Sequence, residues 1–455
     1  MFDVSFMRVL RPSTLTIVIA CAILIVGGLF LPTSSSAAGK ALQYDKQGRV
    51  IGSTTYSKAP KTNNKHKGST PNSANPNSSG FGSGSNSGFG SGPSKFNPDT
   101  AFEPGEVVIL NPPPNFQDKI SAKNFRVLEI VSLGNLGMRL ARVRTPNTMS
   151  VPDAIRALSR VLPGVTIEAN TQFDPSGSIQ ASRTTANPRT KAGWDNLSPT
   201  CGKGLVIGQI DASVDLKHPA LKNQDITYRA FTKSGRKPAT DGHGTAVAAI
   251  LVGSADWGGL QPGAKLYAAN MFEKNEAGKT VGSSIGLLRA VDWMVSLKVH
   301  ALNLSISGSD NKIVRKAFEI AKKHNLILIA SAGNWGRSDK PAFPAAYSHV
   351  LAVTAIKSDG RVYTHANTGS YVDFAEPGVE VYTAAPGGGG KVTSGTSYSA
   401  PYVTVMAAIL KQAGKAPNVA ALRKILSGAT QDLGKPGKDN VFGFGKIKAR
   451  PICKS

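Results

Sequence analysis

Acidic side chains are scarce in this 455-residue chain, which has 28 Asp and Glu residues against 53 Lys and Arg residues and a net charge of +25. The basic residues are dispersed and are not grouped with aromatic residues in a recognition motif, so no specific nucleic-acid partner is predicted. Such a charge is typical of an envelope protein that adheres to anionic surfaces. Histidines are also few. The six besides His243, which is discussed below, are not spaced as metal ligands, so no metal site is predicted.

The N-terminus has the pattern of an export signal. Arg8 and Arg11 precede an apolar run over residues 15–31, which is followed by small residues up to Ala38. This pattern predicts a signal peptide over residues 1–38 and a secreted or periplasmic protein. The run has 17 residues, near the lower limit for a spanning helix, so an uncleaved membrane anchor is the alternative.

Cysteine is rare, with three residues in the chain. Cys201 and Cys453 lie near the two ends of the C-terminal half, and an exported protein meets an oxidising compartment. The pair is therefore a disulfide candidate, with two free thiols as the alternative, because the sequence does not give the separation of the two Cα atoms.

Residues 39–101 consist mostly of Ser, Gly, Asn, Pro and Lys, with few aliphatic residues. Such a composition cannot bury enough apolar area to offset the entropy of ordering, and it predicts a low-complexity flexible linker. The linker is either a spacer between a membrane and the rest of the protein or a leader with no further role.

The pattern changes over residues 102–175, where apolar strand patterns alternate with two helical ones. Ser150 opens the second helix as its N-cap, with Pro152 in the first turn. The predicted order is βαββαβ, a small ferredoxin-like α+β domain. Its elements are expected at residues 107–110, 116–122, 125–133, 137–143, 150–162 and 165–167.

Near-continuous apolar runs follow over residues 190–455, as expected for strands of a parallel sheet that is covered on both faces. They lie at residues 205–210, 266–269, 301–306, 326–330 and 350–353. Helical patterns separate them, one after His243 and two over residues 284–295 and 313–324. The prediction is a doubly wound α/β domain, whose functional residues lie beyond the carboxyl ends of the strands.

Three segments of this domain supply the groups of an acyl-transfer site. Asp211 follows an apolar run, His243 lies between two glycines, and Ser397 begins a helical pattern. A serine hydroxyl needs a neutral imidazole to take its proton, and the imidazole needs a carboxylate to fix its tautomer. Asn334, after another apolar run, offers an amide for a developing oxyanion.

With these motifs, in the order Asp, His, Ser, the chain from about residue 194 onward resembles a subtilisin-like (subtilase) serine peptidase. The resemblance implies that Asp211 orients the imidazole, His243 is the general base, Ser397 is the nucleophile and Asn334 is the oxyanion donor. It also implies substrate-binding residues, which are Asn303, Leu304, Ser305 and Ile306 in one segment and Gly333 beside Asn334.

The chain departs from the family pattern at Ala212, Ser213 and Ala246, and Ala220 stands where a calcium ligand is common. The departures leave the reacting groups intact. No cofactor is expected, and the usual ligand positions do not support a structural calcium ion.

The resemblance implies that residues 102–175 are an inhibitory prodomain, with a processing region at residues 174–189. The main hypothesis is an exported serine endopeptidase that is matured by prodomain cleavage. The alternative is a catalytically decayed subtilase scaffold that acts as an envelope binding protein. The expected partners are polypeptide substrates and the prodomain, with a membrane as a further partner through residues 15–31.

Overall fold

A computed structural model of the protein describes residues 40–44, 50–55, 96–175, 178–179 and 186–451. The chain forms two compact units, Met1–Ser83 and Gly84–Ser455. In the first unit, β1 (Lys40–Tyr44) and β2 (Val50–Thr55) pair as an antiparallel hairpin. The hairpin lies inside the segment predicted to be a linker, and the β-branched residues of the second strand explain its preference for extended structure.

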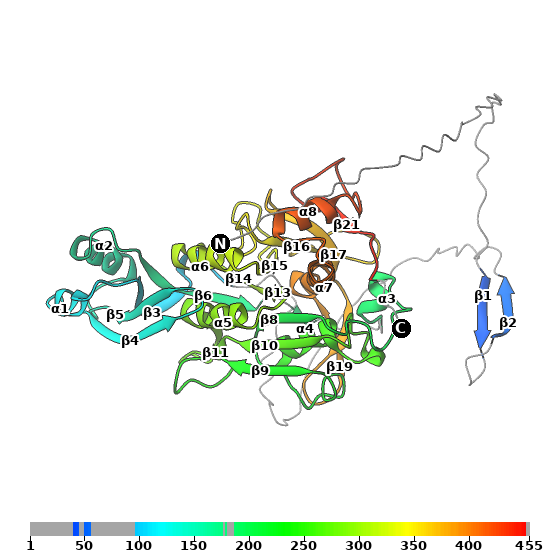
Figure 1. The fold of residues 1–455 in the computed structure, drawn as a ribbon, viewed down its shortest axis with the longest axis horizontal. Coiled ribbons are helices and arrows are strands. Elements are labelled where there is room, and N and C mark those ends of the chain that lie inside the picture. Colours follow the sequence, from blue (N-terminus) through cyan, green and yellow to red (C-terminus); the bar gives the residue numbers. More distant parts are fainter. Residues whose placement is uncertain (1–39, 45–49, 56–95, 176–177, 180–185, 452–455) are drawn as a thin grey trace, which may run out of the picture. The chain divides into compact units, whose positions relative to one another are not determined.

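The second unit contains a seven-stranded parallel sheet, which confirms the predicted α/β class (Figure 1). The strand order is β17-β16-β15-β13-β8-β10-β9. The strands are β8 (Val206–Asp211), β9 (Ile226–Ala230), β10 (Lys265–Asn270), β13 (Ala301–Leu304), β15 (Ile327–Ser331), β16 (Leu351–Ile356) and β17 (Val372–Pro377).

Helices cover both faces of this sheet, and each face has its own hydrophobic core. Along β15, Leu328 and Ala330 pack with α5 (Ser284–Ser296) and α6 (Lys312–Lys323), whereas Ile327 and Ile329 pack with α4 and α7 on the opposite face. This alternation follows from the two-residue period of a strand and explains why the strands are apolar throughout. The helices of the second face are α4 (Gly242–Val252) and α7 (Ala400–Gln412).

Residues 102–175, which we call the upstream domain, form the predicted βαββαβ unit. Its sheet order is β6-β3-β5-β4, with all neighbours antiparallel. Apolar side chains of the two helices close a core of their own against one face of this sheet. The elements are β3 (Phe102–Leu110), α1 (Phe116–Ser121), β4 (Arg126–Leu133), β5 (Met138–Arg144), α2 (Val151–Val161) and β6 (Ile167–Pro175).

The sheet of the upstream domain continues into residues 186–451, which we call the downstream domain. Strand β6 pairs with β12 (Thr280–Ser283), which pairs with β11 (Phe272–Lys274). The other edge of β6 pairs with β14 (Ile306–Gly308). The sequence predicted one strand over residues 301–306, but the structure divides this segment into β13 and β14, which belong to different sheets.

Further short elements complete the described part of the second unit. Strands β18 (Val381–Ala384) and β19 (Gly390–Ser394) form a hairpin, and β7 (Ser178–Ile179) joins its edge. Helix α8 (Val419–Ser427) precedes the short pair β20 (Thr430–Gln431) and β21 (Lys446–Ile447). The short helices are α3 (Pro188–Ala192), η1 (Pro98–Thr100), η2 (Ala255–Trp257) and η3 (Thr396–Tyr398).

Candidate active site

Asp211 and His243 form a buried hydrogen-bonded pair at the carboxyl end of β8, an interior strand of the parallel sheet. Asp211 is the last residue of β8, and His243 is the second residue of α4. Nδ1 of His243 lies 2.6 Å from Oδ1 of Asp211, which also accepts from the N–H of Ala212 at 2.6 Å. Because the carboxylate accepts at Nδ1, it fixes the tautomer that leaves Nε2 as a proton acceptor.

Gly244 allows α4 to begin this close to the end of β8. A Cβ atom at this position would lie 2.3 Å from the carbonyl oxygen of Ala212 and 2.4 Å from that of Ser213. Any larger residue would push the first turn of α4, and with it His243, away from Asp211. The glycine of the sequence motif therefore holds the carboxylate and the imidazole together.

Ser397 lies in the 3-10 turn η3, and α7 begins at Ala400, three residues later than the sequence suggested. Its side chain is buried, and its hydroxyl donates to the carbonyl oxygen of Ser305 at 3.4 Å. The next residue, Tyr398, packs its ring 5.6 Å from the His243 ring, between centroids. Burial raises the pKa of Tyr398, so a neutral phenol lies beside the imidazole.

The amide of Asn334 is fixed by the residue before Ser397. Its Oδ1 atom accepts from the N–H and the hydroxyl of Thr396, at 3.1 and 3.0 Å. The two amide donors of Asn334 therefore point away from Thr396. Ser397 is thus held between Thr396, which is bonded to Asn334, and Tyr398, which packs on His243.

Three buried polar atoms of this group have no hydrogen-bond partner among the described residues: Oδ2 of Asp211, Nε2 of His243 and Nδ2 of Asn334. No hydrogen bond therefore joins His243 to Ser397 in this structure, because the serine hydroxyl is directed to Ser305 instead. Buried atoms left unpaired cost free energy, and they are concentrated where a protein must bind or transform a ligand.

The predicted substrate-binding residues divide into two groups. Asn303, Leu304 and Ser305 support the site from inside: Asn303 donates to the hydroxyl of Ser305 at 2.9 Å, which donates to the carbonyl of Ser397 at 2.9 Å, and Leu304 belongs to the core. Gly333 has a φ of +98° and donates to the Thr396 hydroxyl at 3.2 Å. Ile306 differs from these residues because it lies in β14, outside the parallel sheet, and pairs with a segment from outside the downstream domain.

That segment is the end of the upstream domain. Strand β6 lies between β12 and β14, with Phe173 opposite both Gly282 and Gly308, and Pro175 opposite Ile306. Beyond residues 176–177, which lie outside the described residues, Ser178 pairs with Ser394 of β19, three residues before Ser397. The chain thus approaches Ser397 along β14 and continues along β19.

A second contact beside the site lies outside the sequence-based prediction. Phe96 stacks on Trp335, the residue after Asn334, with ring centroids 5.8 Å apart and 20° between the planes. Both side chains are buried, together with Ala101 and Ala342. Phe96 belongs to the segment predicted to be a linker, and a single aromatic residue in a polar sequence gives no signal of such packing.

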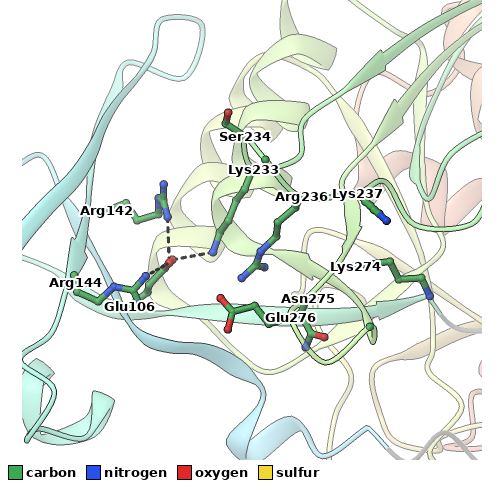
Figure 2. Close-up of a pocket in the computed structure, with 12 residues that line it drawn as sticks. Glu106, Arg142, Arg144, Lys233, Ser234, Arg236, Lys237, Lys274, Asn275 and Glu276 are labelled. Carbon is green, nitrogen blue, oxygen red and sulfur yellow. Dashed lines mark hydrogen bonds and ion pairs between the residues drawn. The ribbon is translucent and has the colours of Figure 1, made fainter.

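Charged residues of the two domains also meet near β6, in a network that the sequence analysis did not predict (Figure 2). Glu103 and Glu106 of β3 are 1% and 3% exposed. Burial raises the pKa of Glu103, but hydrogen bonds from Arg236 and Lys233 outweigh this effect and lower it to about 2. The pKa of Glu106 is likewise raised by burial but lowered overall, mainly by Lys233. Both carboxylates are therefore ionised at neutral pH.

The remaining predicted sites give less information. Cys201 is buried and disulfide-bonded, whereas Cys453 lies outside the described residues. The residues that the structure describes contain no group of three His, Cys, Asp or Glu side chains that could hold a metal ion, and the expected lack of cofactors stays a prediction. They also contain no helix that could span a membrane; the apolar run over residues 15–31 is outside them.

The chain is similar to known proteins in sequence and in fold. Residues 202–445 match the model of the Subtilase family (peptidase S8). The chain is 30% identical over 256 residues to the minor extracellular protease Epr of Bacillus subtilis, which covers 54% of this chain and 38% of that protein. It is also 30% identical over 221 residues to subtilisin-like protease 3 of Arthroderma benhamiae, covering 47% of this chain and 54% of that protein. The chain thus spans about two fifths to half the length of these relatives.

A solved structure agrees at the level of the fold. Fervidolysin from Fervidobacterium pennivorans, described as a keratinolytic enzyme related to subtilisin, has a TM-score of 0.62 and 21% identity, over 77% of this chain and 61% of that one. The downstream domain is therefore a subtilisin-like α/β domain with an Asp–His pair at the carboxyl end of strand β8. The chain belongs to the subtilase family.

Proposed function

We propose that this protein is an exported serine endopeptidase that cleaves peptide bonds through an acyl-enzyme on Ser397. The observation that carries the proposal is the buried Asp211–His243 pair, 2.6 Å apart, whose Nε2 atom has no partner among the described residues. A carboxylate that fixes Nδ1 while Nε2 stays free is the arrangement that a general base requires.

The reaction begins when the Ser397 hydroxyl turns from the Ser305 carbonyl to Nε2 of His243 and gives up its proton. The oxygen attacks the substrate carbonyl, and Asp211 stabilises the imidazolium that forms. Nδ2 of Asn334 and the N–H of Ser397 donate to the oxyanion. His243 then protonates the leaving amine, and it later activates the water that hydrolyses the acyl-enzyme.

The substrate is an extended polypeptide that pairs with β12 and β14, as β6 does here. Main-chain pairing gives affinity without a strong demand on sequence. Because β6 occupies this groove, the upstream domain serves as an intramolecular inhibitor, and cleavage between the two domains matures the enzyme. The signal-like N-terminus and the name of the extracellular relative support export.

A fluorophosphonate probe tests the proposal, because it reacts only with an activated serine. The processed wild-type protein should be labelled at Ser397, and Ser397→Ala and His243→Ala should not be labelled. Ser399→Ala is the matched control: Ser399 is a buried serine two residues away that donates to the Glu376 carbonyl, and its loss should leave labelling intact. In addition, Ser397→Ala should accumulate at full length.

Absence of labelling in the processed wild-type protein would contradict the proposal. It would favour the alternative, a decayed subtilase scaffold that acts as a binding protein. Normal maturation of Ser397→Ala in a host without other proteases would contradict self-processing alone.

A further inference from the structure

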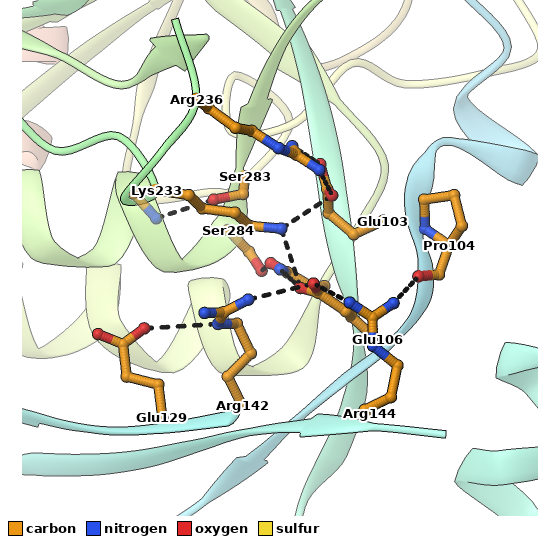
Figure 3. A network of polar contacts seen from close by, with 12 residues as sticks. Glu103, Pro104, Glu106, Glu129, Arg142, Arg144, Lys233, Arg236, Ser283 and Ser284 are labelled. Carbon is orange, nitrogen blue, oxygen red and sulfur yellow. Dashed lines mark hydrogen bonds and ion pairs between the residues drawn. The ribbon is translucent and has the colours of Figure 1, made fainter. Parts of the chain in front are cut away.

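Two cations of the downstream domain hold carboxylates of the upstream domain. Lys233 and Arg236 lie in the loop between β9 and α4. Nζ of Lys233 lies 2.8 Å from Glu103 and 3.0 Å from Glu106. The guanidinium of Arg236 binds both carboxylate oxygens of Glu103, at 3.1 and 2.9 Å (Figure 3). It also binds Glu273 of its own domain at 2.8 Å.

Release of the upstream domain would leave these cations without most of their partners. Glu103 and Glu106 would depart with β3, so the only carboxylate left in the network beside Lys233 and Arg236 would be Glu273. Two further cations, Lys237 and Lys274, and one further carboxylate, Glu276, line the adjoining pocket of about 790 Å³ from the downstream domain, so cations still outnumber carboxylates there. The mature enzyme would therefore carry a net positive charge at this place, close to its groove.

One side chain of β6, the strand that lies in the groove, extends toward Arg236. Gln172, next to Phe173 in β6, lies opposite Ser283 of β12. Its Nε2 atom donates to Oε1 of Glu103 at 3.1 Å, and the same oxygen accepts from Arg236 at 3.1 Å. The tip of Gln172 is thus separated from the Arg236 guanidinium by a single carboxylate oxygen.

We propose that Lys233 and Arg236 form a subsite that selects substrates with an acidic residue at the position of Gln172. A glutamate there, in a peptide bound as β6 is bound, would place its carboxylate where Glu103 Oε1 lies in the precursor. Arginine and lysine bind a carboxylate with hydrogen bonds between two charged groups, which are stronger than those that a neutral glutamine side chain can make to the same cations. The inference rests on the proposed function, because it assigns a specificity to the same groove.

The test uses the mature enzyme and a fluorogenic peptide with the sequence of residues 170–179, donor and quencher at its ends. Replacing the glutamine that corresponds to Gln172 by glutamate should raise kcat/KM about fivefold, and lysine should lower it by a similar factor, as expected for a partly exposed charge pair. Arg236→Gln and Lys233→Gln should each reduce this preference, and the double variant should abolish it.

Lys237→Gln is the matched control, since it removes a nearby positive charge that makes no contact with Glu103 or Glu106 in the described residues. It should keep the preference. Fluorophosphonate labelling of every variant shows that its active site is intact.

Equal kcat/KM values for the three peptides in the wild-type enzyme would overturn the subsite, as would an unchanged preference in the double variant. Absence of both hydrolysis and fluorophosphonate labelling is a different result, because it would overturn the proposed function and the subsite with it.

Discussion

At the scale of single residues, the candidate active site contains hydrogen-bonding atoms that are already buried and unpaired in the absence of substrate. Asn334 is the clearest case, because Thr396 fixes its carbonyl oxygen and leaves its Nδ2 atom unpaired in a buried position. An amide that is oriented in advance costs no reorganisation when the oxyanion develops.

Asn334→Leu should therefore lower kcat about 100- to 1,000-fold and leave KM nearly unchanged, because the donor acts in the transition state rather than in the bound substrate. Steady-state hydrolysis of a fluorogenic peptide measures both values. Thr396→Val, which removes one of the two hydrogen bonds that orient the amide, should give a smaller loss. A KM effect in Asn334→Leu with kcat unchanged would contradict a role in the oxyanion hole.

Glu376 of β17 is a buried carboxyl group outside the site. Burial raises its pKa to about 8, although its side chain accepts from the N–H of Ile447 at 2.9 Å. The folded protein therefore binds a proton that the unfolded chain releases near pH 4.5. The contribution of Glu376 to stability should therefore be complete below about pH 4.5 and should be lost as the pH rises toward 8.

Glu376→Gln keeps an acceptor for Ile447 without a titratable group, so it should remove this pH dependence. In the Ser397→Ala background, it should raise Tm by about 5 °C at pH 8 and have little effect at pH 4.5. Thermal unfolding followed by circular dichroism measures both values. Glu380→Gln, at an exposed residue, is the control. An equal shift at both pH values would show that burial does not raise the pKa of Glu376.

At the scale of elements, local sequence predicted most of the elements that it named within one or two residues. However, β6 extends eight residues beyond its predicted end at residue 167, and β9, β17, α8 and the hairpin β18–β19 were not predicted. The unit βαββαβ was predictable because each element carries its own apolar period and ends at turn residues. The pairing of β6 with β12 and β14 was not predictable, because it joins segments more than 100 residues apart that have no shared local signal. The division between β13 and β14 at Ser305 depends on the same pairing.

The site shows a similar limit. The motifs predicted Asp211, His243, Asn334 and Ser397 as site residues. The structure bonds Asp211 to His243 and Asn334 to Thr396, the residue before Ser397, and the catalytic roles stay a prediction. The direction of the Ser397 hydroxyl depends on one side-chain rotation, which the sequence does not encode. Glu103 looks like a solvent-facing residue of a strand, since its cationic partners follow 130 and 133 residues later.

The segment before β3 makes a contact of its own with the downstream domain. Phe96 is buried on Trp335, and the following residues are held by Ser309, which donates to the Pro98 carbonyl, and by an ion pair between Asp99 and Lys340. The upstream domain is therefore attached beside Asn334 as well as in the groove.

Phe96→Ala should weaken this attachment by about 3 kcal/mol, because it removes a buried aromatic side chain. Progress curves of peptide hydrolysis after processing should show a shorter lag before full activity. Phe96→Leu, which keeps apolar burial but loses the stacked ring, should give an intermediate lag. An unchanged lag in Phe96→Ala would show that this contact does not delay release of the upstream domain.

At the scale of the whole second unit, the two domains share one antiparallel sheet and one network of ion pairs. The shared sheet fixes the register of the inhibitor in the groove, and the ion pairs add charge complementarity at its side. Main-chain hydrogen bonds between strands do not depend on pH below neutrality. The ion pairs do, because Glu103 and Glu106 become protonated in acid.

These two carboxylates give a pH dependence whose sign follows from their pKa values. The pKa of Glu103 is about 2 in the folded chain, lowered from 4.5, and that of Glu106 is also lowered. Their contribution to stability should be complete above about pH 4.5 and should be lost as the pH falls toward 2. A fall in pH from 7 to about 5 should therefore leave Glu103 and Glu106 ionised, and it should not release the upstream domain by breaking their ion pairs.

The double variant Glu103→Gln/Glu106→Gln, in the Ser397→Ala chain, should lower Tm at pH 7 by about 5 °C, because it leaves the half-buried cations Lys233 and Arg236 without Glu103 and Glu106. The difference from the parent chain should shrink steadily below pH 4.5, as the parent carboxylates become protonated. Asp118→Asn, at an exposed residue of the same domain, is the control. A Tm difference that stays constant from pH 7 to pH 3 would contradict the lowered pKa values and would leave the shared sheet as the main attachment between the two domains.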